Sequence, residues 1–135
     1  MNTYNKVSDF DKKIKIMENI SGILHWDSST MMPNNSFRAR SEELAFLSSM
    51  QQKFLRSEQL GRALEVVKED ELNDWQKANV REIRLNRANA LAVDTRLIEL
   101  FTKASSEGKV IWEQARKAKD FKMFAPQLKK IISLS

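Results

Sequence analysis

The chain has 135 residues, the length of one ordinary domain, with 41% hydrophobic and 30% charged residues and a formal net charge of +5. Three glycines and two prolines are too few for the turns of a sheet protein, so the composition favours helices. The lack of cysteine excludes disulfides and thiolate metal sites and suits a reducing compartment.

The first segment, "MNTYNKVSDFDKK", has no apolar stretch followed by a cleavage signal, and no stretch of the chain is long and apolar enough to span a membrane. We therefore expect a soluble, cytoplasmic protein without a membrane partner. The sequence also contains no internal repeat and no low-complexity linker, which predicts a single helical domain over residues 1–135.

Apolar residues at alternating spacings of three and four predict a first helix that runs to about Ser29 and ends before Pro33, because proline cannot donate into the helical ladder. Ser8 and Asp11 have the spacing of a capping box near its start. The apolar stripe consists of Val7, Phe10, Ile14, Met17, Ser21 and Leu24.

Two further helices follow the proline, and the short loops predict antiparallel neighbours. The second helix carries its apolar stripe from Phe37 to Phe54, and Ser57 is placed to cap a short third helix with Leu60, Leu64 and Val67.

The fourth predicted helix, residues 72–92, is unusually polar for a core element. Its three regularly spaced arginines, Arg81, Arg84 and Arg87, are interpreted as a solvated face, because no aromatic residues interleave with them for stacking on nucleic acid bases. Nucleic acid is therefore not an expected partner.

A fifth helix capped by Asp94 or Thr95 carries Gly108 within its apolar stripe, where close packing would compensate for the helix-destabilising glycine. We expect the same of Gly22 in the first helix. In the last segment Asp120 serves as a cap, Pro126 fits a first helical turn, and an apolar stripe continues to the last residues. The predicted fold is an all-α, antiparallel bundle of about five or six helices.

The chemistry of the chain is limited by its single histidine, His25, because a catalytic zinc ion normally needs at least two nitrogen or sulfur ligands. Ser21 and Ser29 share a helix face with His25, but a regular helix offers neither a strained nucleophile nor an oxyanion hole. The stretch "KASSEGKVI" lacks the first glycine and the hydroxyl residue of a phosphate loop. We therefore predict no catalytic residue, no metal ligand and no cofactor in this chain.

Two motifs give the chain a resemblance to a known family. "HWDSSTMMPNNSFRARSEEL" and "WEQARKAKDFKMFAPQLKKII" resemble motifs of the carboxypeptidase Taq family of zinc metallocarboxypeptidases, in the same order and across essentially the whole chain. The matching residues are Trp26, Asp27, Thr30, Met32, Pro33, Ala39, Arg40 and Leu44, then Trp112, Ala115, Arg116, Asp120, Phe121, Phe124, Ala125, Pro126 and Leu128.

The resemblance implies an all-helical enzyme that removes single amino acids from the C-terminus of peptides. Its zinc ligands, a His-Glu-x-x-His helix and a further glutamate, do not occur in these residues. By resemblance the chain corresponds to the N-terminal wall or lid of the substrate groove. It is expected to be inactive alone, with zinc bound elsewhere in the full enzyme.

The break between the first two helices is the candidate site. We expect Asp27 to cap the next helix or to pair with Arg38 or Arg40, and Trp26 to pack as the apolar anchor of this corner. The resemblance also makes His25 and Asp27 candidates to face the substrate groove, although a structural role is the favoured interpretation. The structural corner comprises Trp26, Asp27, Pro33, Arg38 and Arg40.

Several partners are consistent with this interpretation. A split enzyme predicts a second chain that carries the zinc region, and the apolar final segment is compatible with a homo-oligomer. The alternative is a basic helical interaction module, or a decayed remnant, that binds a protein or an acidic surface.

Overall fold

The computed structural model describes residues 3–135, and all regular structure in this part is helical. The predicted all-α helical bundle of five or six helices is therefore confirmed. Its α-helices are α1 (Thr3–Thr30), α2 (Phe37–Arg56), α3 (Glu58–Glu65), α4 (Asp74–Ala92), α5 (Thr95–Ala118) and α6 (Ala125–Leu134). Short 3-10 helices occupy Asn34–Ser36, Glu69–Glu71 and Phe121–Met123.

The chain divides into two compact units. The first comprises the residues up to Ile20 together with Met50–Thr95, and the second comprises Ser21–Ser49 together with Arg96–Ser135. The long helices α1 and α2 therefore contribute to both units. The single domain expected from the sequence stays a prediction.

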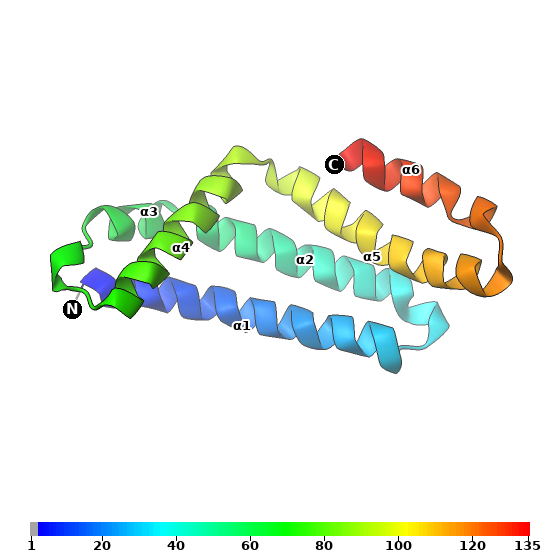
Figure 1. Ribbon diagram of the computed structural model, residues 1–135, viewed down its shortest axis with the longest axis horizontal. Helices are drawn as coiled ribbons and strands as arrows, with labels where there is room; N and C mark the ends of the chain where they lie inside the picture. Colours follow the sequence, from blue (N-terminus) through cyan, green and yellow to red (C-terminus); the bar gives the residue numbers. More distant parts are fainter. Residues whose placement is uncertain (1–2) are drawn as a thin grey trace. The chain divides into compact units, whose positions relative to one another are not determined.

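The core of the first unit is formed by residues of α1, α3 and α4 and of the turns around α3, with the end of α2 running antiparallel to α1 beside it (Figure 1). Phe10 packs against this core, and its ring lies edge-on to Phe54 with the centroids 6.4 Å apart. Burial of apolar side chains removes their surface from water and is the main stabilising contribution. The buried residues are Tyr4, Val7, Leu60, Ala63, Leu64, Val67, Leu72, Val80 and Ile83.

Side-chain caps begin α3 and α4. Ser57 Oγ accepts a hydrogen bond from the Gln59 amide at 3.2 Å, which confirms the predicted cap of α3. At α4, Asn73 and Gln76 form a reciprocal capping box with bonds of 2.8 and 3.1 Å. This box begins α4 at Asp74, two residues later than the sequence analysis placed it.

The predicted end of the first helix is confirmed, because α1 stops at Thr30 and leaves Pro33 outside. The predicted capping box of Ser8 and Asp11 is wrong, because α1 begins at Thr3 and both residues lie in its interior.

The interpretation of the α4 arginines as a solvated face is wrong for Arg87, which is half-buried, whereas Arg81 and Arg84 are exposed. Arg84 donates to the Leu64 carbonyl at 3.0 Å and contacts the Glu69 carboxylate. Arg87 donates to the Leu55 carbonyl at 2.6 Å, and to a second carbonyl in the turn between α2 and α3 at 2.8 Å. The Leu64 and Leu55 carbonyls lie at helix ends that leave them unpaired, whereas the second carbonyl bound by Arg87 also accepts from a backbone amide at 3.1 Å.

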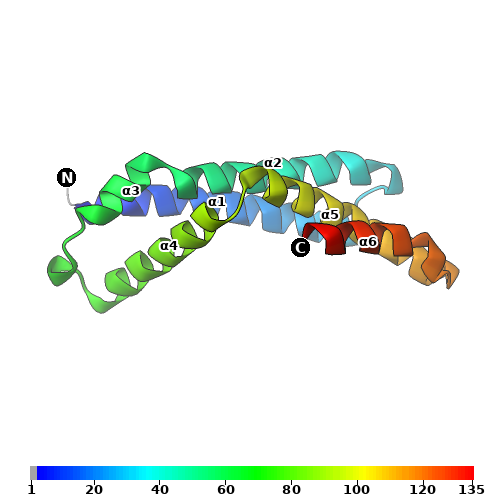
Figure 2. The same cartoon turned by 90° about the horizontal axis from the view of Figure 1, so that it is seen from above.

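In the second unit α6 folds back along α5, as both views show (Figure 1 and Figure 2). A Cβ atom on Gly108 would lie 2.7 Å from Ile131 Cδ1, which confirms the predicted close packing there. Gln127 Nε2 also donates to the Ala104 carbonyl at 2.9 Å. The same expectation for Gly22 is wrong, because a Cβ atom there would meet nothing within 4 Å.

The end of α5 is a Schellman motif. The Asp120 amide donates to the Ala115 carbonyl at 3.0 Å, and the Lys119 amide donates to the Arg116 carbonyl at 3.2 Å. Lys119 has a φ of 53°, so a lysine takes the left-handed conformation that glycine usually supplies. Asp120 then caps the following turn by accepting from the Lys122 amide at 3.0 Å, as predicted.

α6 begins with Pro126 in its first turn, as predicted, and its apolar residues are only partly covered. Ile131 lies over Gly108, whereas Ile132 is exposed. No helix within residues 3–135 combines the length and apolar character needed to cross a membrane.

Candidate functional site

The corner that joins α1 to α2, residues 25–40, lies entirely in the second unit. In the last turn of α1, Ser28, Ser29 and Thr30 each donate a hydroxyl hydrogen bond to the carbonyl four residues earlier, at 2.8, 3.0 and 2.8 Å. The amides of Met31 and Met32 both donate to the Asp27 carbonyl at 2.9 Å. The Asp27 carbonyl is thereby paired at the helix end, whereas the three hydroxyl groups bond back to carbonyls one turn earlier in the helix.

Arg40 holds the two sides of the corner together from the first turns of α2. Its Nη2 lies 2.9 Å from Asp27 Oδ2, and its Nη1 donates to the Leu24 carbonyl at 2.8 Å. Weaker or more exposed contacts join Arg40 to Ser28 Oγ at 3.4 Å and to Glu43 at 3.2 Å. With 16% of its side chain exposed, the guanidinium binds a carboxylate and a backbone carbonyl of α1 at once, which its planar fork of donors allows.

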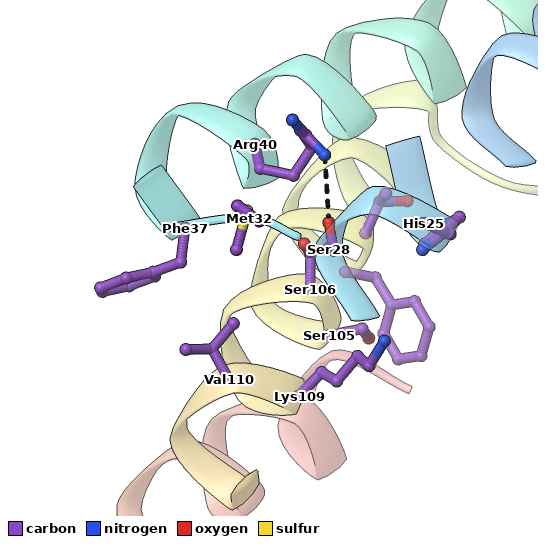
Figure 3. A pocket seen from close by; sticks show the side chains of 11 residues that line it. His25, Ser28, Met32, Phe37, Arg40, Ser105, Ser106, Lys109 and Val110 are labelled. Atoms are coloured by element: carbon purple, nitrogen blue, oxygen red, sulfur yellow. Dashed lines mark hydrogen bonds between the residues drawn. The ribbon is translucent and has the colours of Figure 1, made fainter. Parts of the chain in front are cut away.

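A cavity of about 250 Å³ opens beside this corner, between the end of α1, the start of α2 and α5 (Figure 3). Its lining is mainly apolar, and Arg40 and Lys109 are its cationic side chains. Lys109 Nζ contacts Ser29 Oγ at one edge. The remaining lining residues are His25, Ser28, Met32, Phe37, Phe101, Thr102, Ser105, Ser106 and Val110.

Buried hydroxyl groups tie α2 to α5 next to this cavity. Ser41 is fully buried, and its Oγ donates to the Phe37 carbonyl at 2.8 Å and lies 3.2 Å from Ser106 Oγ. Further along the same helices Thr102 Oγ1 lies 3.3 Å from Ser48 Oγ. The small hydroxyl side chains let the two helices approach closely while keeping their polar atoms paired.

The structure separates the roles of the predicted corner residues. Of the alternatives left open for Asp27, the ion pair with Arg40 is the one observed. Arg38 is exposed, and its guanidinium lies 5.9 Å from the Phe37 ring. The expectation that Trp26 packs as the apolar anchor of the corner is wrong, because this side chain is 61% exposed.

The two candidates to face the substrate groove, His25 and Asp27, have different surroundings in the structure. His25 lines the cavity, whereas Asp27 points its carboxylate at Arg40 and is not among the lining residues. The side of the cavity formed by α5 was not predicted. In the sequence, the hydroxyl residues of α5 and Lys109 are typical of an ordinary helix surface. Only the apolar stripe through Gly108 indicated that α5 packs closely against a neighbour.

The residues described do not fit a zinc site. Within residues 3–135 no group of three or more histidine, cysteine, aspartate or glutamate side chains is placed to hold a metal ion. A zinc ion in a metallopeptidase is held by such a group, usually with at least two imidazoles. We therefore derive no chemical step through zinc for the residues of this chain.

Comparison with known proteins gives a consistent match. The family model described as "Carboxypeptidase Taq (M32) metallopeptidase" matches residues 6–135. Thermostable carboxypeptidase 1 of Thermus thermophilus is 28% identical over 98% of this chain and 27% of its own length. Carboxypeptidase 1 of Bacillus subtilis is 25% identical over the whole of this chain and 28% of its own length.

A solved structure extends the comparison to the fold. The chain described as "BsuCP Crystal Structure" matches with a TM-score of 0.93 at 23% sequence identity, over 98% of this chain and 27% of that chain. The chain thus spans about a quarter of the length of the relatives it matches.

Proposed function

Because the chain belongs to the carboxypeptidase Taq (M32) metallopeptidase family, we propose that it is the N-terminal helical part of an enzyme that removes single amino acids from the C-terminus of peptides. In this proposal the chain supplies one wall of the substrate groove. The zinc ion and its ligands belong to the rest of the enzyme, and the chain alone is inactive.

One observation carries the proposal. The family match runs through residues 6–135, yet these residues correspond to only 27% of the Thermus thermophilus carboxypeptidase. A metallopeptidase needs several ligands that converge on one ion, and this chain contains a single histidine and no cysteine. The chain therefore suits the role of scaffold better than that of catalyst.

The contacts within the corner support this scaffold role. Arg40 binds Asp27 and the Leu24 carbonyl at once, so the helix ends beside the cavity are held in one arrangement. A groove wall needs such fixed geometry, because a misplaced wall would misplace the peptide. We propose that His25 at the cavity edge faces the substrate and that Asp27 positions the corner through Arg40.

Purified chain tests the proposal by its zinc content and by release of amino acids from a blocked dipeptide or longer peptide. We expect no bound zinc after dialysis against metal-free buffer and no release above the buffer blank. Stoichiometric zinc together with turnover from this chain alone would refute it.

The alternative is a basic interaction module, suggested by the net charge of +5. The structure reduces its support, because Arg84 and Arg87 are engaged with groups of their own unit. Binding to nucleic acid that weakens linearly in log affinity against log salt would favour this alternative.

A cytoplasmic location is also part of the proposal, supported by the lack of cysteine. A homo-oligomer is a second possible assembly besides a split enzyme. Light scattering of the purified chain separates a monomer from a homo-oligomer.

A further inference from the structure

The end of α1 exposes large apolar side chains. Three large apolar side chains within nine residues of the second unit are each more than half exposed, namely Ile23 at 67%, Trp26 at 61% and Met31 at 72%. We call these three residues the α1-end surface. Ile23 and Trp26 lie three positions apart and are therefore neighbours on the helix surface, and Met31 follows just beyond the helix end. Single exposed apolar residues are common on proteins, but neighbouring ones mark a binding surface.

The corner holds Trp26 in this exposed position. Successive residues of an α-helix are rotated by about 100° around its axis, so Trp26 and Asp27 point in different directions. Because Asp27 is fixed on Arg40 at 2.9 Å, Trp26 is turned away from that contact. Thr30 Oγ1 also bonds to the Trp26 carbonyl at 2.8 Å, which steadies the backbone under the indole. A side chain presented by fixed backbone loses little conformational freedom when a partner binds.

Gly22 provides a second observation on the same helix. It lies four residues before Trp26, hence on a neighbouring part of the helix surface. A glycine within a helix is destabilising relative to alanine, and it is usually explained by close contact with a neighbour. A Cβ atom on Gly22 would meet nothing within 4 Å, so no described residue of this chain explains it. The space beside Trp26 is thus open to a group from outside the chain.

We propose that the α1-end surface binds the part of an M32 carboxypeptidase that lies outside this chain, the part that carries the zinc ligands. This inference rests on the proposed function. It is supported by length, because the matching solved structure contains nearly three quarters of its chain beyond the portion that corresponds to these residues. Tryptophan is also among the residues that most often dominate the binding energy of an interface.

The test uses a probe of defined composition, the Bacillus subtilis carboxypeptidase 1 without the segment that matches this chain. Its binding to the wild-type chain is measured by calorimetry and compared with Trp26→Ala and Ile23→Lys. We expect each substitution to weaken binding by roughly 30-fold or more, as for a central interface residue. Trp75→Ala is the matched control, because Trp75 is 72% exposed but lies on α4 in the first unit. Trp75→Ala should change the dissociation constant of the probe less than twofold.

Circular dichroism verifies that the probe and each variant are folded before binding is measured, and Ile23→Lys keeps the test valid if Trp26→Ala does not fold. Binding by the wild type that neither variant weakens would overturn the α1-end surface while leaving the proposed function intact. No binding of the probe by the wild type would instead count against the proposed function. Self-association that Trp26→Ala abolishes would identify a second copy of this chain as the occupant and overturn the proposal.

Discussion

Replacement of Arg40 by alanine tests whether this side chain joins the two helices of the corner. The substitution removes the ion pair with Asp27 at 2.9 Å and the bond to the Leu24 carbonyl at 2.8 Å. The Asp27 carboxylate is 34% exposed, so solvent screening limits the pair to about 1 kcal/mol. A charged hydrogen bond to a buried or half-buried carbonyl contributes about 1.5 kcal/mol. The Glu43 carboxylate is 52% exposed and adds little.

We therefore expect Arg40→Ala to lower the free energy of unfolding by about 2.5 kcal/mol. For a chain of this size that loss corresponds to a drop in Tm of roughly 8–10 °C. Urea denaturation followed by circular dichroism measures the first quantity, and a thermal scan measures the second.

The control is Arg38→Ala, two residues earlier on the same helix. Arg38 is exposed, and its guanidinium lies over the Phe37 ring at 5.9 Å, so its removal should change stability by no more than about 0.5 kcal/mol. A double-mutant cycle of Arg40→Ala with Asp27→Ala should give a coupling of about 1 kcal/mol. A cost for Arg40→Ala no larger than that for Arg38→Ala would refute the account of the corner.

Further substitutions test the packing of the helices, each by urea denaturation. Gly22→Ala should stabilise the chain by roughly 1 kcal/mol, since the added methyl group meets nothing within 4 Å. Gly108→Ala should be less favourable than Gly22→Ala by at least about 1 kcal/mol, because Ile131 Cδ1 lies 2.7 Å from the added atom, and equal gains would contradict the packing of α6 on α5. Arg87→Ala should cost about 2 kcal/mol, because the Leu55 carbonyl loses its donor and the Ser57 carbonyl keeps only the Gly61 amide, whereas the exposed Arg81→Ala should cost less than about 0.5 kcal/mol. Similar costs for both arginines would restore the interpretation of α4 as a solvated face.

The helices were predictable because their signals are local. Apolar spacing located each helix, and the caps at Ser57 and Asp120 needed only residues two positions away. The end of α5 was less readable, because Lys119 occupies the left-handed position where glycine usually marks a helix end.

The partners of long charged side chains were not predictable in the same way. The spacing of Arg84 and Arg87 indicates that they share a helix face, but not what that face meets. Their guanidinium groups reach carbonyls 20 and 32 residues earlier in the chain. Only the arrangement of α2, α3 and α4 brings those carbonyls within reach.

The contacts of the corner between α1 and α2 also depend on residues that are distant in the sequence. The sequence left three roles open for Asp27, namely capping the next helix or pairing with Arg38 or Arg40 across the break, and only the structure identifies the pair with Arg40. For Trp26 the sequence indicates only that an apolar side chain is present. It does not distinguish a residue packed within its own chain from one that is 61% exposed. The cavity likewise depends on residues of α5 that lie more than seventy positions from His25.

The central claim, that this chain is one part of a carboxypeptidase whose catalytic centre lies elsewhere, is tested most directly by a mixing assay. Amino acid release from a peptide is measured with zinc present for this chain, for the complementary part of an M32 carboxypeptidase, and for the two together. We expect release from the mixture only. Release by this chain alone, or an inactive mixture in which the two parts are bound, would contradict the claim.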